Sequence, residues 1–203
     1  MGSGLVYGSM RGSLRPEDVV PRLRGRLGRP YRFVERCAST QRLLGEDDPE
    51  GAVVVADEQT EGRGRLGRKW LAQAGTSLLV SVLLRPDVEP ARLPELSLVA
   101  GRACAEAITD VAGLETEVKF PNDVLVQGRK VAGILAEASE GRVVLGVGVN
   151  VSQEAGQLPA EARTPATSLL LETGREIDRA ELLVALLERL ERRYDKWLGA
   201  GDG

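Results

Sequence analysis

The 203-residue sequence contains no histidine and only two cysteines. Without histidine there is no Ser-His triad, no histidine general base and no histidine-ligated zinc, so any chemistry must use other side chains. Cys37 and Cys104 lack the spacing of a metal site or a disulfide framework. We therefore expect both to be buried thiols in a protein of the reducing cytoplasm.

Two further absences concern membranes and nucleic acids. No apolar run approaches the ~18 residues of a membrane span, and residues 1–13 (MGSGLVYGSMRGS) are too rich in glycine and serine for a signal peptide. Lys and Arg total 27 against 30 Asp and Glu, which gives a net charge of −3 and no global basic field. We expect neither a membrane nor a nucleic-acid partner, and any cationic site must be local.

The composition, with 42% hydrophobic and 28% charged residues, predicts one folded domain. We expect residues 1–14 to be a flexible lead-in and residues 15–203 to form the domain. Hydrophobic periodicity and turn residues predict separate runs of strands and helices, which favours an α+β fold with a mixed, mostly antiparallel sheet flanked by helices. The expected helices lie within residues 15–28, 93–111 and 178–198, and the expected strands within residues 31–35, 52–56, 76–84 and 116–151.

The glycine-rich loop at residues 62–70 (GRGRLGRKW) is the first candidate site. Its GxGxxG spacing suggests a dinucleotide fingerprint, but no long crossover helix follows it, which argues against that interpretation. Arg63, Arg65, Arg68 and Lys69 place four cations on a flexible backbone. Guanidinium groups hold carboxylate or phosphate oxygens in pairs, so the loop is suited to holding a carboxylate and a nucleotide phosphate together. The alternative is a solvated basic turn.

Three later segments also carry candidate residues. Asn122 and Asp123 in KFPND offer oxygens for Mg²⁺, or Asp123 accepts a proton from an amine, although a plain turn is the alternative. Lys130 heads a strand in which Gly133 leaves a gap for a backbone or ligand. In GVGVNV, residues 146–151, glycines alternate with valines before Asn150 and open one sheet face to a flat ligand. An ordinary packed strand is the alternative there.

Taken in order, these motifs resemble the catalytic domain of the biotin protein ligases. The resemblance rests on Ser39-Thr40, GRGRLGRKW, KFPNDVLVQGRKVAGILAE and GVGVNV, spans about residues 31–151, and extends to ATSLLLETG at residues 166–174. It implies the fold of class II aminoacyl-tRNA synthetases and biotin synthetases. It also implies that biotin and Mg²⁺-ATP form biotinyl-5′-adenylate, and that a lysine of a biotin carboxyl carrier protein, as in acetyl-CoA carboxylase, then takes the biotinyl group.

The same resemblance implies roles for individual residues. The expected biotin-binding residues are Ser39, Thr40, Gln41, Gln59, Gly62, Arg63, Gly64, Arg65, Lys130 and Gly133. The expected ATP-binding residues are Arg65, Arg68, Trp70, Asn122 and Asn150, with Trp70 near the adenine. Asn122 and Asp123 are the expected metal ligands, and Arg63, Lys130 and Asp123 are the expected catalytic residues.

The sequence also departs from the family pattern. Phe120 stands where the family usually has tryptophan, and Gln41 where it usually has asparagine. We expect a monofunctional enzyme without the DNA-binding domain and without the C-terminal β-barrel of many members, and a homodimer is common in the family. A lipoate or octanoate ligase is disfavoured because the sequence has neither an SGGG loop nor a histidine-bearing motif. A catalytically silent module that binds biotin or nucleotide is the remaining alternative.

Overall fold

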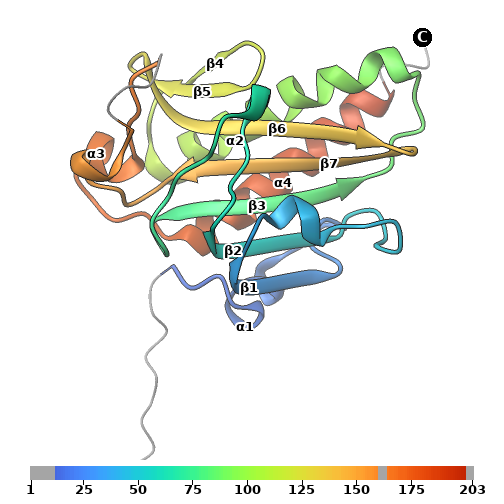
Figure 1. Cartoon of the computed structure of the whole chain (residues 1–203), viewed down its shortest axis with the longest axis horizontal. Coiled ribbons are helices and arrows are strands. Elements are labelled where there is room, and N and C mark those ends of the chain that lie inside the picture. Colours follow the sequence, from blue (N-terminus) through green and yellow to red (C-terminus); the bar gives the residue numbers. More distant parts are fainter. Residues whose placement is uncertain (1–11, 160–163, 200–203) are drawn as a thin grey trace, which may run out of the picture.

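The computed structural model describes residues 12–159 and 164–199, which form a seven-stranded sheet with helices (Figure 1). The strand order is β1-β2-β3-β7-β6-β5-β4. Only β1 and β2 pair in parallel, and every other neighbouring pair is antiparallel. This confirms the predicted mixed, mostly antiparallel sheet. The strands are β1 Tyr31–Cys37, β2 Val53–Gln59, β3 Ser77–Leu84, β4 Glu117–Lys119, β5 Asp123–Val126, β6 Arg129–Ser139 and β7 Arg142–Asn150.

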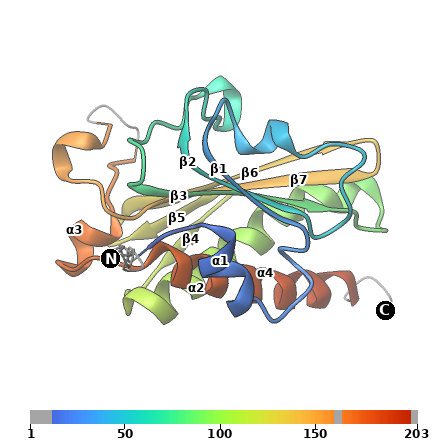
Figure 2. The same cartoon turned by 90° about the horizontal axis from the view of Figure 1, so that it is seen from below.

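The helices lie mainly on one side of the sheet. Figure 2 shows α1, α2 and α4 below it, with the blue β1–β2 connection and the teal β2–β3 connection above it. The two long helices therefore leave the opposite face to loops. The α-helices are α1 Pro16–Val19, α2 Leu96–Ala112, α3 Leu169–Thr173 and α4 Arg179–Gly199, and short 3₁₀ turns include η1 Val20–Arg22, η2 Thr40–Leu43 and η3 Arg65–Gly67.

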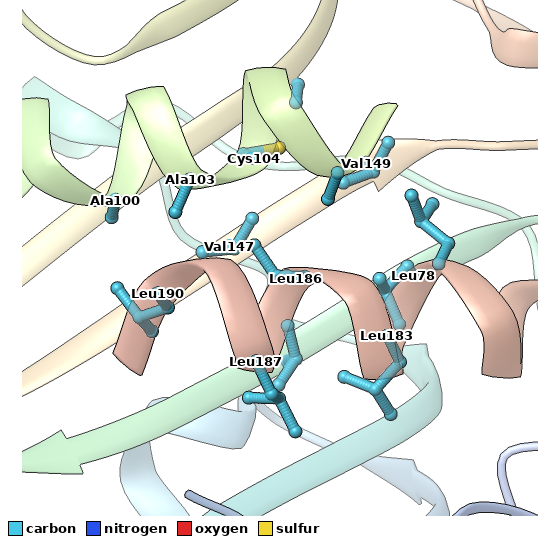
Figure 3. Close-up of a cluster of buried hydrophobic side chains, with 14 of the residues drawn as sticks. Leu78, Ala100, Ala103, Cys104, Val147, Val149, Leu183, Leu186, Leu187 and Leu190 are labelled. Atoms are coloured by element: carbon cyan, nitrogen blue, oxygen red, sulfur yellow. The ribbon is translucent and has the colours of Figure 1, made fainter. Parts of the chain in front are cut away.

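The core lies between the sheet and the pair α2 and α4 (Figure 3). The apolar side chains of α4 recur at the 3.6-residue period of a helix and are buried. The helix α2 contributes mainly small side chains, so it can lie close to its neighbours. Burial of each leucine is worth about 1.5 to 3 kcal/mol relative to exposure. The labelled core residues are Leu183, Leu186, Leu187 and Leu190 of α4, Ala100, Ala103 and Cys104 of α2, and Leu78, Val147 and Val149 of the sheet.

The start of α4 and the end of α2 lie within one residue of the predicted positions. Asp178 precedes α4, and its Oδ1 accepts hydrogen bonds from the backbone N–H groups of Ala180 and Glu181 at 2.8 and 3.0 Å. These bonds satisfy two of the free donors at the start of the helix. At the end of α2, Gly113 adopts a left-handed conformation with φ 72° and donates to the carbonyl of Thr109. A glycine is suited to this cap because it has no Cβ.

The N-terminal part differs from the sequence predictions. The expected helix in residues 15–28 is only α1, followed by the 3₁₀ turn η1, in which Pro21 removes a donor. Leu14 belongs to the expected lead-in, yet it is buried in the core and its carbonyl accepts a hydrogen bond from the Tyr31 hydroxyl at 2.7 Å. Residues 1–11 of the expected lead-in lie outside the described residues.

Two smaller differences lie in β2 and at a cysteine. The strand β2 continues past residue 56 to Gln59 because β1 pairs with it as far as Cys37. Cys104 is buried as expected, but Cys37 is only partly buried at the end of the edge strand. In the part of the chain that the structure describes, no helix is long and apolar enough to cross a membrane.

Candidate active site

A cavity of about 830 Å³ opens on the sheet face opposite α2 and α4. Strand alternation explains its floor, because successive side chains point to opposite faces. Val80, Ile134 and Val147 pack into the core, whereas their neighbours, such as Ser81 and Gly148, turn toward the cavity. Three of these cavity-facing positions are glycines and leave the floor hollow. They are Gly133 of β6 and Gly146 and Gly148 of β7, with Gly133 paired directly with Gly148.

The structure brings nearly all the predicted site residues to this one cavity. Gly62 is the exception. It is buried, its carbonyl accepts a hydrogen bond from the Trp70 backbone N–H, and an added Cβ would collide with the Trp70 carbonyl oxygen. Gly62 therefore closes the base of the loop and is not among the residues that line the cavity, so its contact with biotin stays a prediction. The predicted residues that line the cavity are Ser39, Thr40, Gln41, Gln59, Arg63, Gly64, Arg65, Arg68, Trp70, Asn122, Asp123, Lys130, Gly133 and Asn150.

One end of the cavity holds a buried cluster of hydroxyl and amide groups. The Thr40 backbone N–H and hydroxyl both donate to Gln59 Oε1, at 2.7 and 3.0 Å, and the Thr40 hydroxyl lies 2.8 Å from the hydroxyl of Ser81. Gln41 donates from Nε2 to the carbonyls of Leu135 and Val144. Sequence reasoning missed Ser81, although a serine inside the apolar run TSLLVSVLL was a usable signal.

Lys130 and Asp123 form an ion pair in the middle of the cavity. Their Nζ and Oδ1 atoms are 2.6 Å apart, and the Lys130 ammonium lies 5.6 Å from the centroid of the Trp70 ring. The strands β5 and β6, which carry Asp123 and Lys130, pair with a shift in register between Val124 and Leu125. The backbone of Lys130 is also hydrogen-bonded to residues 165–167. Its N–H donates to the Pro165 carbonyl, and its carbonyl accepts from the Thr167 N–H. Two predicted catalytic groups are thus in direct contact.

Arg63 forms an ion pair with Glu137, a residue that sequence reasoning missed. The closest oxygen lies 2.6 Å from Arg63 Nη2, and both side chains are partly exposed. The two residues are 74 positions apart, so only the fold of β6 against the loop places them together. Arg65, Arg68 and Lys69 form no ion pair within residues 12–159 and 164–199. Their charges therefore remain available to an anionic ligand.

The Trp70 indole lies on the glycine floor. A Cβ added at Gly148 would be 2.7 Å from Trp70 Cε2, and one added at Gly133 would be 2.9 Å from Trp70 Cζ3. Only glycine at these two positions lets the ring approach the strands so closely. Trp70 Nε1 is buried and finds no acceptor among the described residues. An unpaired buried donor costs about 1 to 3 kcal/mol, so this site favours a ligand that supplies an acceptor.

Two asparagines at the cavity are held by hydrogen bonds. Asn122 donates from Nδ2 to the carbonyl of Ile134 at 2.9 Å. Asn150 donates to the carbonyl of Thr167 and accepts from Nε2 of Gln153. Among the described residues, no group of three or more His, Cys, Asp or Glu side chains is placed to hold a metal ion. A divalent ion at this site would therefore take few protein oxygens, as Mg²⁺ does when phosphate and water complete its shell.

The sequence resembles known proteins over most of its length. Residues 33–154 match the model of the Biotin/lipoate A/B protein ligase family. The chain is 43% identical over 157 residues to the biotin--[acetyl-CoA-carboxylase] ligase of Mycobacterium tuberculosis, covering 75% of this chain and 58% of that protein. It is 39% identical over 184 residues to the bifunctional ligase/repressor BirA of Bacillus subtilis, covering 86% of this chain and 57% of that protein. The chain thus spans less than two thirds of each relative.

A solved structure agrees in fold. The biotin protein ligase from Aquifex aeolicus, in complex with biotin and ATP, is 39% identical and superposes with a TM-score of 0.75, covering 82% of this chain and 71% of that one. The predicted class II synthetase-like fold is thereby confirmed. With a family match over more than half of its residues, the chain belongs to the biotin/lipoate A/B protein ligase family.

Proposed function

We propose that the protein activates biotin with ATP and attaches it to a lysine of a carrier protein. One observation carries this proposal. A single cavity joins a hydroxyl and amide cluster, a flat glycine floor and a cationic loop. These three parts match the ureido group, the fused rings and the carboxylate of biotin, in that order. The Mycobacterium tuberculosis relative is a biotin--[acetyl-CoA-carboxylase] ligase, and the Aquifex aeolicus structure holds biotin and ATP.

Biotin fits the buried end of the cavity by its hydrogen-bonding groups. Its ureido carbonyl needs donors and its two N–H groups need acceptors, and Ser39, Thr40, Gln59 and Ser81 offer both. The glycine floor then gives room for the fused rings once the Trp70 ring, which lies on Gly133 and Gly148, shifts aside. This orientation points the valeryl carboxylate toward Lys130, at the side where the loop lies. A ureido group buried without partners would lose about 1 to 3 kcal/mol per unpaired group, so the cluster selects for it.

ATP fits the other end by charge and by the orphan donor. Arg65 and Arg68 offer guanidinium groups for the phosphates, and the adenine offers the acceptors that Trp70 Nε1 lacks. Asn122 and Asp123 would hold Mg²⁺, which neutralises phosphate charge and orients the triphosphate. Asp123 is already paired with Lys130, so the ammonium has to share this carboxylate.

The reaction follows from these positions. In the first step a carboxylate oxygen of biotin attacks the α-phosphorus, a P–O bond to the β-phosphate breaks, and pyrophosphate leaves. Arg63 and Lys130 offset the repulsion between the two anions and hold them in line. In the second step the neutral amine of the acceptor lysine attacks the acyl carbon. A C–N bond forms, the acyl C–O bond breaks, AMP leaves, and Asp123 takes the proton from the amine nitrogen.

The remaining parts of the proposal concern the setting of the enzyme. We propose a carrier domain of acetyl-CoA carboxylase as the acceptor, residues 15–203 as the catalytic domain and the cytoplasm as the location. No nucleic-acid partner is proposed because of the net charge of −3. A homodimer is also proposed, since β1 is an edge strand and edge strands can pair with a second chain.

Biotin-dependent exchange between ATP and pyrophosphate tests the activation step. We expect exchange with biotin and none with lipoate or octanoate. Exchange with lipoate alone would move the protein to the other branch of its family, whose model covers both kinds of ligase. No exchange with any of these acids, together with biotin binding by calorimetry, would make it a silent binding module.

A further inference from the structure

Three of the exposed large hydrophobic residues border the cavity. They are Leu66, Leu71 and Phe120, with 87%, 65% and 79% of their surface exposed. Leu66 and Leu71 belong to the β2–β3 connection, and Phe120 belongs to the turn between β4 and β5. Single exposed leucines are ordinary, but a group of large apolar side chains around one opening is typical of an interaction site.

The backbone at Leu66 supports a role outside the core. Leu66 has φ 58° and ψ 38°, a left-handed conformation that residues with a Cβ rarely adopt. Its side chain is almost fully exposed to solvent, so packing does not explain its position. Strained backbone of this kind is concentrated at functional sites.

The charges at the same opening are mainly positive. Six cations line the cavity, against Asp123 as the only acidic residue in its described lining. Two of the cations are paired, Arg63 with Glu137 and Lys130 with Asp123. Four others, within the described part of the chain, have no ion pair, although Lys119 donates to the Thr164 hydroxyl. These four are Arg65, Arg68, Lys69 and Lys119.

The charge balance changes during the proposed reaction. While ATP is bound, the triphosphate offsets these cations. Once pyrophosphate has left, the adenylate retains one phosphate charge, so the opening holds an excess of positive charge when the acceptor must approach. Complementary charge steers association and fixes orientation. The acceptor that fits this opening is therefore acidic.

We infer that these residues form a docking rim for the acceptor domain, an inference that rests on the proposed function. The docking rim consists of Leu66, Leu71 and Phe120 together with Arg65, Arg68, Lys69 and Lys119. Its partner is a protein domain with an acidic surface and apolar side chains beside the acceptor lysine. The apolar contacts hold the domain while the lysine amine enters the cavity and attacks the acyl carbon, releasing AMP.

The test separates docking from chemistry with two acceptors. Hydroxylamine reacts with the adenylate and releases AMP without docking, whereas the isolated biotin-accepting domain of a bacterial acetyl-CoA carboxylase requires it. The variants are Leu66→Asn, because asparagine tolerates the left-handed backbone, and Phe120→Ser. Leu171→Asn is the matched control, since Leu171 is an exposed leucine outside the cavity lining.

We expect pyrophosphate exchange and hydroxamate formation to stay within about twofold of wild type for all three variants, as is usual for surface substitutions. For the carrier domain, KM should rise about 5- to 20-fold in each rim variant and stay unchanged in the control, because an apolar contact is lost. Salt should raise the carrier KM but leave the hydroxylamine rate unaltered.

Three outcomes would overturn the inference. Equal losses with hydroxylamine and with the carrier domain would place the residues at the adenylate. An unchanged carrier KM in both variants would remove the docking role. A change of oligomeric state in sedimentation, with carrier transfer intact, would assign the rim to a second copy of the chain. Absence of exchange in the wild-type protein would instead overturn the proposed function itself, and the docking role with it.

Discussion

A methyl group added to the cavity floor tests whether the ligands lie on the glycines. In Gly148→Ala the new Cβ would be 2.7, 2.9 and 3.1 Å from Cε2, Cζ2 and Cδ2 of Trp70. Carbon atoms in contact prefer about 3.5 to 4.0 Å, so the indole has to move away from the strand by close to one ångström or leave the floor. Overpacking of this kind costs about 1 to 3 kcal/mol. If that cost falls on ligand binding, affinity drops about 5- to 150-fold.

Pyrophosphate exchange, with biotin and ATP varied separately, measures the effect. We expect higher KM values for both substrates, because the added methyl displaces the indole and occupies the floor. The fluorescence emission of Trp70 should shift to longer wavelength in the variant as the ring moves toward water. Both proteins carry Trp197→Phe in this measurement, so that the other tryptophan does not contribute. Gly45→Ala is the control, since nothing lies within 4 Å of its added Cβ.

Wild-type KM values in Gly148→Ala would refute the reasoning, because ligands on the floor must meet the methyl group. A loss in the free energy of unfolding as large as the loss in binding free energy would also contradict it. In that case the substitution would act on folding and not on the site.

Three further predictions concern side chains in or near the cavity and in the core. Lys130→Ala should lower kcat for adenylate formation about 10- to 150-fold, with a smaller change in biotin affinity measured by calorimetry, because a charge-assisted contact to the reacting phosphate is worth about 1.5 to 3 kcal/mol. Equal losses in both would contradict this role. Glu137→Gln should release Arg63 and increase leakage of the adenylate about two- to fivefold, while the free energy of unfolding changes by less than about 1 kcal/mol, since the pair is partly exposed. A loss of stability without leakage would make the pair structural. Burial raises the pKa of Cys104 from 9.0 to about 12. The buried, protonated Cys104 thiol contributes its full share of the folding free energy below pH 9, and this contribution is lost as the pH rises toward 12. Thiol labelling at pH 8 should modify Cys37 but reach Cys104 only after unfolding. Labelling of Cys104 in the folded protein would show that the core opens.

Much of the fold could be predicted because its signals are local. The α4 stripe repeats every three to four residues, and Asp178 and Gly113 mark helix ends by their own hydrogen-bonding and backbone properties. The strands β3 and β7 are short runs rich in valine and leucine. Where the signal was weak, as at Pro21, the predicted helix was too long. Short segments near proline are decided by packing with distant residues.

The candidate site divides in the same way. Residue types and spacing alone determined which segments carry chemistry, since a glycine-rich cationic loop, KFPND and GVGVNV are each unusual without reference to the fold. The tertiary structure decided which groups meet. It set Gly133 opposite Gly148, paired Arg63 with Glu137, and turned Gly62 toward the base of the loop. The physical reason is that these contacts depend on strand order and register between segments far apart in the chain, and a local pattern carries no information about either.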